Sequence, residues 1–197
     1  MNTMSLSQST SSIQAKCTIS FDRRAIIPLK ENILWQIEAG VVRTSTLLED
    51  GELITFGLWG PGDIVGKILA GVSTYQVDCL SQVKAYPLVL SPNQSLAKTT
   101  FNHLQQLQEL TIIRSYKRVE VMLLRLLSWL AQKFGQEVKT GQLIDLRMTH
   151  QDLADMLGST RVTITRTLSQ LEQQGLIERL SLHQIILREE DMWHYEI

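Results

Sequence analysis

Cysteine and long apolar runs are scarce in this sequence, and each scarcity excludes a class of protein. Among 197 residues there are two cysteines, Cys17 and Cys79, which form neither a CxxC pair nor a cluster with metal-ligand spacing. We therefore expect two reduced thiols, no disulfide framework and no metal site. No segment reaches about eighteen uninterrupted apolar residues, so we expect no membrane-spanning helix and no membrane partner.

The N-terminal residues are polar. The first sixteen, MNTMSLSQSTSSIQAK, are rich in Ser and Thr and lack the apolar run of a signal peptide. We predict a disordered leader over residues 1–20 and a cytoplasmic protein. With 44% hydrophobic and 20% charged residues, the rest of the chain has the composition of a globular protein.

A pattern that would indicate catalysis is also missing. Residues 60–67, GPGDIVGK, have the outline of a phosphate loop, but three residues rather than four separate Gly62 from Gly66, and Ile68 replaces Ser or Thr. The histidines are scattered along the chain, and the acidic residues 189–191 have the character of a solvated tail. We predict that the protein is no enzyme and has no catalytic residue and no cofactor.

The net charge of −1 hides an uneven distribution. Residues 114–135 carry five Lys or Arg and one acidic residue, whereas residues 136–197 carry six basic and ten acidic residues. A C-terminal segment of this charge can bind DNA only through a few placed arginines and backbone groups. We therefore expect a modest salt dependence for such binding.

Residues 21–94 have the pattern of a small antiparallel β domain. Runs rich in Val, Ile, Leu, Thr and aromatic residues alternate with turn signals at residues 39–40, 49–51 and 60–63. Short strands separated by turns at intervals of about ten residues indicate a barrel or roll. Ser91-Pro92 ends the pattern.

Residues 95–134 have the period of helices. A narrow apolar stripe predicts a long helix over about Leu96 to Tyr116, and a wider stripe from Val119 to Leu130 predicts an amphipathic helix. The narrow stripe suits packing on a second copy of the same helix, and an ordinary core-facing helix is the alternative. The narrow stripe consists of Phe101, Leu104, Leu107 and Leu110.

Residues 135–197 predict a winged helix-turn-helix. After a polar linker between Gly135 and Gly141, a strand precedes a helix that Thr149 and Asp152 mark with a capping box. Gly158 then forms a turn before a second helix over about residues 160–174, and two short strands with a turn at residues 181–183 follow. The predicted fold class is α+β.

The second helix carries the residues that suit DNA. The helix begins in the stretch GSTRVTITR, residues 158–166. At 100° per residue, one side of this helix carries Ile164, Leu168 and Leu171, and Val162 lies opposite Leu171. The outward set predicts base and phosphate contacts; the alternative is a solvated face whose arginines pair with Asp155 or Glu172. The predicted DNA-contacting residues are Gln151, Ser159, Thr160, Arg161, Val162, Thr163, Thr165 and Arg166.

Residue chemistry assigns roles within this set. An arginine can bond O6 and N7 of a guanine together, and a valine methyl can contact the C5-methyl of thymine. The hydroxyls of Ser159, Thr160 and Thr163, with free amides at the helix start, suit phosphate oxygens, and Gln151 adds another phosphate contact.

The stretch MTHQDLADMLGSTRVTITRTLSQLEQQGLIERL, residues 148–180, resembles the recognition motif of the Crp/Fnr superfamily of bacterial transcription regulators. The order of roll, long helix and winged helix-turn-helix is similar to that family across about residues 20–190. The resemblance implies a cyclic-nucleotide-binding-like roll, a homodimer made through the long helix, a palindromic double-stranded DNA site and RNA polymerase as a partner.

One branch of the superfamily is the most similar in the recognition helix. Many members have a glutamate after the first recognition arginine, where this chain has Val162. Arg161, Val162 and Arg166 resemble the nitrogen-control regulators of cyanobacteria, whose half-site is GTA. By that likeness the two arginines read guanine-containing steps and the valine reads a thymine.

The sensor region departs from the family pattern. Family members that bind cyclic nucleotides have a glycine followed by a ribose-binding Glu, and this chain has Gly66 followed by Lys67. Those members also have an Arg that clamps the cyclic phosphate, and this chain has Tyr75-Gln76 in that region. Since an anionic phosphate without its arginine is poorly held, we expect no dependence on cyclic AMP. These four residues are the candidate effector pocket, in which Lys67 is either solvated or meets an anionic metabolite.

The β region is also short at its start, because FDRRAIIPLKE replaces two further strands of a typical family roll. This predicts an abbreviated roll with a smaller pocket or none. The alternative function is a ligand-sensing or protein-interaction module of the same fold, in which DNA contacts are secondary.

Overall fold

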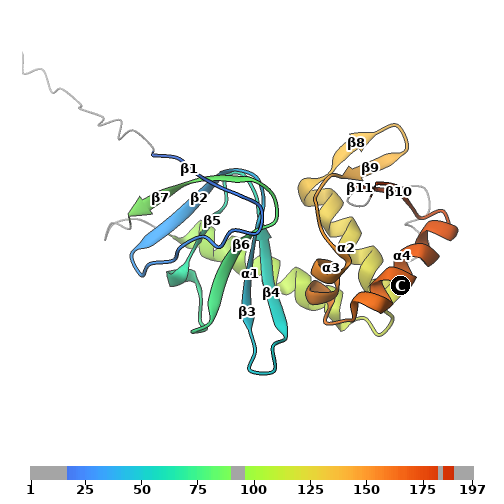
Figure 1. Ribbon diagram of the computed structural model, residues 1–197, viewed down its shortest axis with the longest axis horizontal. Coiled ribbons are helices and arrows are strands. Elements are labelled where there is room, and N and C mark those ends of the chain that lie inside the picture. Colours follow the sequence, from blue (N-terminus) through green and yellow to red (C-terminus); the bar gives the residue numbers. More distant parts are fainter. Residues whose placement is uncertain (1–16, 90–95, 182–183, 189–197) are drawn as a thin grey trace, which may run out of the picture.

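The computed structural model describes residues 17–89, 96–181 and 184–188. They form a β-roll, a long helix that runs from the roll, and a C-terminal α/β unit beside it (Figure 1). The predicted Ser91-Pro92 break, the turn residues 182–183 and the acidic residues 189–191 lie outside the described residues. No helix of the described ranges is long and apolar enough to cross a membrane.

The roll consists of two antiparallel sheets with strand orders β1-β7-β2-β5 and β4-β3-β6. Their apolar faces enclose one core cluster, in which Trp35, Val42, Trp59 and Val77 are buried. Gly40 adopts a positive φ of 83° at the tight turn between β2 and β3, where the sequence predicts a turn. The strands are β1 (Ile19–Phe21), β2 (Ile33–Ala39), β3 (Val42–Leu47), β4 (Leu53–Trp59), β5 (Ile64–Gly66), β6 (Tyr75–Cys79) and β7 (Val83–Val89).

The roll begins earlier than the sequence predicts. Ile19 and Ser20, within the predicted leader, pair with Ala85 and Lys84 of β7. The hydrogen-bonding partner of β1 lies more than sixty residues away in the sequence, so the local polar composition conceals the strand. The fold class itself agrees with the prediction.

Two helices follow the roll. They are α1 (Ala97–Ser115) and α2 (Val119–Phe134). Phe101, Leu104 and Ile112 of α1 are 64%, 52% and 59% exposed, whereas Leu110 is 1% exposed and faces the core. The exposed stripe therefore includes Ile112 and excludes Leu110, because a strict spacing of three drifts around a helix of 3.6 residues per turn.

The C-terminal unit begins with a hairpin where the sequence predicts a linker. Strand β8 (Gln136–Val138) pairs with β9 (Gly141–Ile144), and β11 (Gln184–Leu187) pairs with β9 and with β10 (Ile177–Ser181). Strand β8 has only three residues, two of them polar, so its sequence shows no alternation of apolar and polar residues. Its pairing with β9 is what identifies it as a strand.

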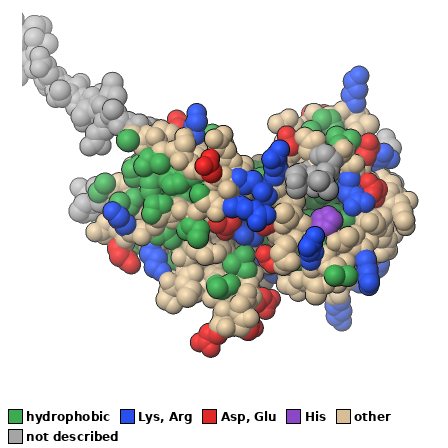
Figure 2. All heavy atoms as spheres, viewed as in Figure 1, with side chains coloured by type: hydrophobic (Ala, Val, Ile, Leu, Met, Phe, Trp, Pro, Cys, Tyr) green, Lys and Arg blue, Asp and Glu red, His purple; other side chains and the backbone are tan. Residues whose placement is uncertain are grey.

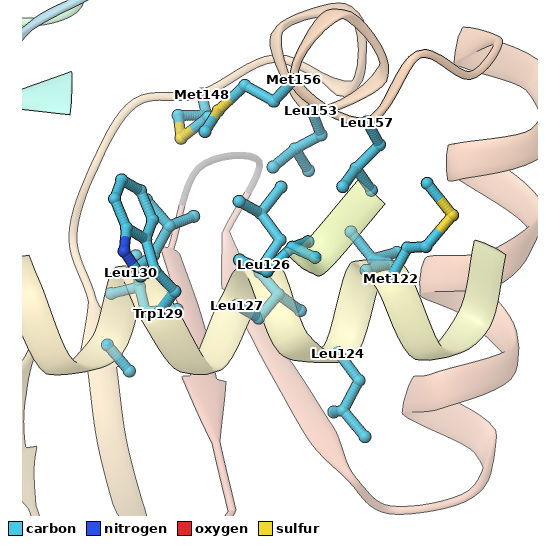
Figure 3. Packing of buried hydrophobic residues seen from close by; sticks show 14 of the residues in the cluster. Met122, Leu124, Leu126, Leu127, Trp129, Leu130, Met148, Leu153, Met156 and Leu157 are labelled. Atoms are coloured by element: carbon cyan, nitrogen blue, oxygen red, sulfur yellow. The ribbon is translucent and has the colours of Figure 1, made fainter. Parts of the chain in front are cut away.

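Helices α3 (His150–Leu157) and α4 (Arg161–Gln173) pack with α2 over the sheet. In Figure 3, Leu126 of α2 lies on the side of this helix that faces Leu153 and Leu157 of α3, while Leu124 points to the other side. This core fixes the helix-turn-helix to α2 and so to the helix that leaves the roll.

The roll and the C-terminal unit meet through a buried ion-pair cluster. Arg43 of β3 forms two 3.1 Å hydrogen bonds with Asp78 of β6. Its Nη1 lies 3.4 Å from Asp152 Oδ1 and 3.8 Å from Asp155 Oδ2, both on α3. Burial raises the pKa of Asp155, and the Arg43 charge opposes that shift.

Two further arginines bridge the same junction. Arg114 of α1 donates 2.7 Å hydrogen bonds to the carbonyl oxygens of Thr55 in β4 and Met156 in α3. Arg23 donates a 2.7 Å hydrogen bond to the carbonyl oxygen of Arg147. On the face shown in Figure 2, Lys and Arg side chains gather where the two parts of the molecule meet.

Candidate nucleic-acid interface

The turn between α3 and α4 is fixed by backbone geometry and by two caps. Thr149 and Asp152 form the predicted capping box at the start of α3, and Gly158 ends this helix in the left-handed region with φ 61°. Thr160 is the N-cap of α4, where its hydroxyl accepts a 3.2 Å hydrogen bond from the Thr163 amide. These residues set the angle at which α4 leaves the turn.

Helix α4 has one buried and one exposed face, as the sequence predicts. Ile164, Leu168 and Leu171 are buried in the C-terminal core. Val162 is 58% exposed, although its residue type is common in protein cores. The two methyl groups of Val162 therefore lie on the outward surface of α4, between charged and hydroxyl side chains.

Arg161 and Arg166 are exposed, and their guanidinium groups have no ion pair or hydrogen bond with any residue that the structure describes. The two carboxylates that could have neutralised them have other partners. Asp155 faces Arg43, and Glu172 pairs with Arg179 of β10, which lowers the pKa of Glu172. Both guanidinium groups on α4 therefore keep their donors available.

The hydroxyl residues of the predicted set are partly engaged. Thr165 Oγ1 donates to the Arg161 carbonyl oxygen at 2.8 Å and lies 2.8 Å from Nδ1 of His150. Gln151 Nε2 donates to Asp155 at 2.7 Å, which leaves one amide hydrogen for another acceptor. His150 is a member of this surface that the sequence reasoning missed, because only the crossing of α3 and α4 brings it to Thr165.

The start of α4 also offers backbone donors. The amides of Arg161 and Val162 have no acceptor within the described chain, since they belong to the first turn of the helix. The amide of Ser159 donates to the Ala154 carbonyl oxygen, so this residue offers its side chain alone. Free amides at a helix N-terminus suit a phosphate oxygen.

In the candidate effector pocket, Lys67 is committed to its own loop. Its Nζ donates to the carbonyl oxygens of Val72 and Ser73 at 3.0 and 2.8 Å. Gly66 pairs with Leu34 of β2, whose side chain occupies the space where a Cβ would lie. Two of the three Lys67 donors are therefore engaged within the loop, and Gly66 has no side chain to offer a ligand.

Tyr75 and Gln76 belong to opposite faces of β6. Tyr75 is buried in the roll core, and burial raises the pKa of its phenol. Gln76 donates a 3.2 Å hydrogen bond to the hydroxyl of Ser45. Because successive side chains of a strand alternate, the structure does not bring the four predicted residues to one site.

The described residues contain no group of three or more His, Cys, Asp or Glu that could hold a metal. Cys17 is exposed and Cys79 is buried, and both are free thiols. Burial, with the neighbouring Asp78 charge, raises the pKa of Cys79 to about 11, which keeps this thiol protonated and unreactive.

The arrangement of α3, turn and α4 matches a known domain family. Residues 122–192 match the Crp-like helix-turn-helix domain. The chain is 40% identical to the regulatory protein CysR of Synechococcus elongatus, over 80% of this chain and 77% of that protein. It is 30% identical to the global nitrogen regulator of a Synechocystis species, over 70% of this chain and 68% of that protein.

Solved structures share the whole fold. FixK2 from Bradyrhizobium japonicum has a TM-score of 0.77 at 21% identity, covering 91% of this chain and 96% of its own. A CRP/FNR-family regulator from Thermus thermophilus has a TM-score of 0.68 at 27% identity, covering 87% of this chain and 93% of its own. These relatives are transcription regulators rather than enzymes, and the chain belongs to the Crp/Fnr family of bacterial transcription regulators.

Proposed function

We propose that this protein binds a palindromic DNA site as a homodimer, with α4 of each subunit in the major groove of one half-site. Arg161 and Arg166 contact guanines, and Val162 contacts a thymine methyl in a GTA-type half-site. The hydroxyls of Ser159, Thr160 and Thr163, with the amide of Gln151, contact phosphates.

One observation carries this proposal. The guanidinium groups of two exposed arginines on the outer face of α4 have no partner among the described residues, while Arg43 and Arg179 are paired. A free guanidinium breaks no ion pair when it binds a guanine, and its planar fork forms two hydrogen bonds for the side-chain entropy that is lost. Val162 between them supplies the apolar contact.

The homodimer is supported by the outer stripe of α1. Phe101, Leu104 and Ile112 lie on one face of this helix, and each is more than half exposed. A second copy of α1 across a twofold axis would bury all three, since the same patch serves both subunits. Two subunits related in this way present two α4 helices, which suits a palindrome.

Independence from cyclic AMP is supported by the roll. No arginine occurs between Ile64 and Cys79, the segment that contains β5 and β6. The cation of Lys67 already bonds two carbonyl oxygens of its own loop. A cyclic phosphate in the roll would therefore lack the bidentate arginine, and Lys67 would have only one donor left for it.

Fluorescence anisotropy with a labelled duplex tests the DNA contacts. The duplex carries two GTA half-sites about one helical turn apart. We expect Arg161→Ala and Arg166→Ala each to weaken binding about tenfold or more, since a good arginine–guanine pair contributes about 1–3 kcal/mol. Arg24→Ala is the matched control, because Arg24 is an exposed arginine of the roll outside α4.

Unchanged affinity of both α4 variants would show that the recognition helix is assigned wrongly and would favour a sensing or interaction module. Selection from random duplexes tests the half-site separately, and recovery of TGTGA sites would overturn the GTA assignment.

Sedimentation velocity tests the dimer. We expect Leu104→Glu to sediment as a monomer, because each dimer would bury two unpaired carboxylates. Ile26→Glu, at an exposed apolar position of the roll, should sediment as the unmodified dimer. A dimer that persists in the Leu104 variant would place the interface elsewhere.

A further inference from the structure

A cavity of ≈ 290 Å³ lies where the turn between β4 and β5 meets α1 and α2. It is separate from α4 and from the four residues of the candidate effector pocket. Its volume is near the lower end of the range for small-molecule sites, about 300–1,000 Å³. The lining residues are Asp63, Asn102, Gln105, Gln106, Glu109, Trp129, Gln132 and Lys133.

The first polar group without a partner in this cavity is the amide nitrogen of Gln106. This side chain is buried, with 5% of its surface exposed, and its Oε1 accepts a 3.0 Å hydrogen bond from the Leu58 amide. That bond identifies which end of the side chain is engaged. No described residue accepts a hydrogen bond from Nε2. Although the residue as a whole is buried, Nε2 is not among the fully buried unpartnered atoms of the described chain, so it is reachable from the cavity and can donate to a ligand.

The second such group is the ammonium of Lys133. Its Nζ lies 5.1 Å from the ring centroid of Trp59, 5.5 Å from that of Trp129 and 5.6 Å from that of Phe134. No carboxylate of the described chain is within ion-pair distance. Burial lowers the pKa of this lysine, and the more distant charges of Asp63 and Glu109 oppose that shift. The cation is therefore partly desolvated by aromatic rings and has no anionic partner in contact.

Two carboxylates on other walls have an oxygen to spare. Asp63 Oδ2 accepts from the Gly60 amide at 2.9 Å, and Glu109 Oε2 accepts from the Trp129 indole at 2.7 Å. These bonds fix the orientation of both groups. The second oxygen of each has no described donor, so both can accept from a ligand cation.

From these four groups we propose that the cavity is a binding site for a small zwitterion of the α-amino acid class. The ligand carboxylate accepts from Lys133 Nζ and Gln106 Nε2, and the ligand ammonium donates to Asp63 and Glu109. Charge-assisted hydrogen bonds of both signs replace water at groups that the fold leaves unpaired. The carboxamides of Asn102, Gln105 and Gln132 suit a polar side chain.

The location gives such a ligand contact with both halves of the molecule. Asp63 belongs to the roll, Gln106 and Glu109 to α1, and Lys133 to α2. The opposite face of α2 packs against α4. An occupant would therefore connect the roll turn to the helix that supports the recognition helix. The proposal concerns binding and does not rest on the DNA-binding function.

Thermal denaturation with each of the common L-amino acids, followed by isothermal titration calorimetry, tests the site. At about 10 mM, a ligand of millimolar affinity raises the melting temperature measurably. We expect at least one amino acid to bind with 1:1 stoichiometry per chain. Its 2-hydroxy acid and amino alcohol analogues, which lack the ammonium or the carboxylate, should bind about tenfold more weakly.

Substitutions locate the site. Lys133→Gln removes the cation, and Gln106→Glu keeps the acceptor for the Leu58 amide while removing the amide donor. Each should weaken binding about tenfold or more. Lys139→Gln, at an exposed lysine of the β8–β9 turn, is the matched control and should bind normally. Gln132→Glu, at an exposed lining residue, tests the cavity without touching buried packing.

Each result decides the proposal. Weaker binding in the lining variants with normal binding in Lys139→Gln supports it. No saturable binding by any amino acid, equal binding of the 2-hydroxy acid analogue, or unchanged affinity in Gln132→Glu and Lys133→Gln would overturn it.

Discussion

Arg43 in the roll and Asp152 in α3 lie 3.4 Å apart, although 109 residues separate them in the sequence. The same guanidinium bonds Asp78 beside it, so one cation serves carboxylates of both parts of the molecule. The side chains of this pair are 10% and 15% exposed, and this burial distinguishes the contact from a surface ion pair.

Removing Arg43 should therefore destabilise the protein strongly. Arg43→Gln leaves Asp78, Asp152 and Asp155 without their cation, and we expect a loss of about 3 kcal/mol in urea denaturation. The control is Arg188→Gln, which breaks a 2.9 Å pair with Glu178 whose side chains are 46% and 40% exposed. That loss should be within about 1 kcal/mol. Equal losses would mean that the inter-domain cluster contributes no more than a surface pair.

Stability should fall at acidic pH because of His103. Its ring stacks on Trp59 at 3.7 Å between centroids, and burial lowers its pKa below the ordinary value. Between that lowered pKa and about 6.5, the unfolded chain binds a proton that the folded chain does not. The free energy of unfolding therefore does not depend on His103 above about pH 6.5, where the imidazole is neutral in both states. It decreases as the pH falls below that value.

Urea denaturation at about pH 7.5 and pH 5.5 measures this effect in the unmodified protein and in His103→Gln. We expect the drop in unfolding free energy to be smaller in the variant, which has no imidazole to protonate. Identical drops would assign the pH dependence to other groups.

Val162→Glu should change the preferred DNA sequence. A glutamate at this exposed position can accept from the N4 amino group of a cytosine, and it loses the contact with the thymine methyl. We expect the preference between GTA sites and their T-to-C variants to shift by about 1–3 kcal/mol in competition anisotropy. Val162→Ala is the control, and it should weaken binding without favouring cytosine. An unchanged preference would exclude Val162 from base contact.

Two glycines with similar backbone angles should respond differently to Ala. Gly40 and Gly51 have φ of 83° and 86°, so Ala is strained at both. At Gly40 the added methyl also overlaps the carbonyl oxygen of Gln82, whereas at Gly51 nothing lies within 4 Å. Thermal denaturation should show a loss of about 1–2 kcal/mol for Gly51→Ala and a clearly larger loss for Gly40→Ala.

The helix-turn-helix could be predicted from the sequence nearly residue by residue, because its signals are local. The capping box at Thr149 and the glycine turn at 158 each act within a few residues, and the structure has both. The second helix begins at Arg161, next to the predicted start near residue 160. The buried stripe of α4 follows from helical period alone. The strand at Ile19–Phe21 depends on a partner more than sixty residues away, and the local sequence did not reveal it. The strand at Gln136–Val138 pairs with the neighbouring β9, but its short, polar sequence carries no alternating apolar signal.

The candidate DNA surface shows the same division. Sequence established which residues of α4 face outward, but two carboxylates remained as alternative partners for its arginines. Tertiary packing removed that alternative, because Arg43 and Arg179 approach Asp155 and Glu172 from other elements.

By itself, then, the sequence determined the order of roll, long helix and winged helix-turn-helix, and the face of the recognition helix, since propensity, capping and periodicity act over neighbouring residues. Only the tertiary structure decided which polar groups are engaged and which are free. Arg161 is left unpaired on α4, while Lys133 and Gln106 meet at one cavity from two different helices. Pairing of this kind depends on elements that the chain brings together only when it folds.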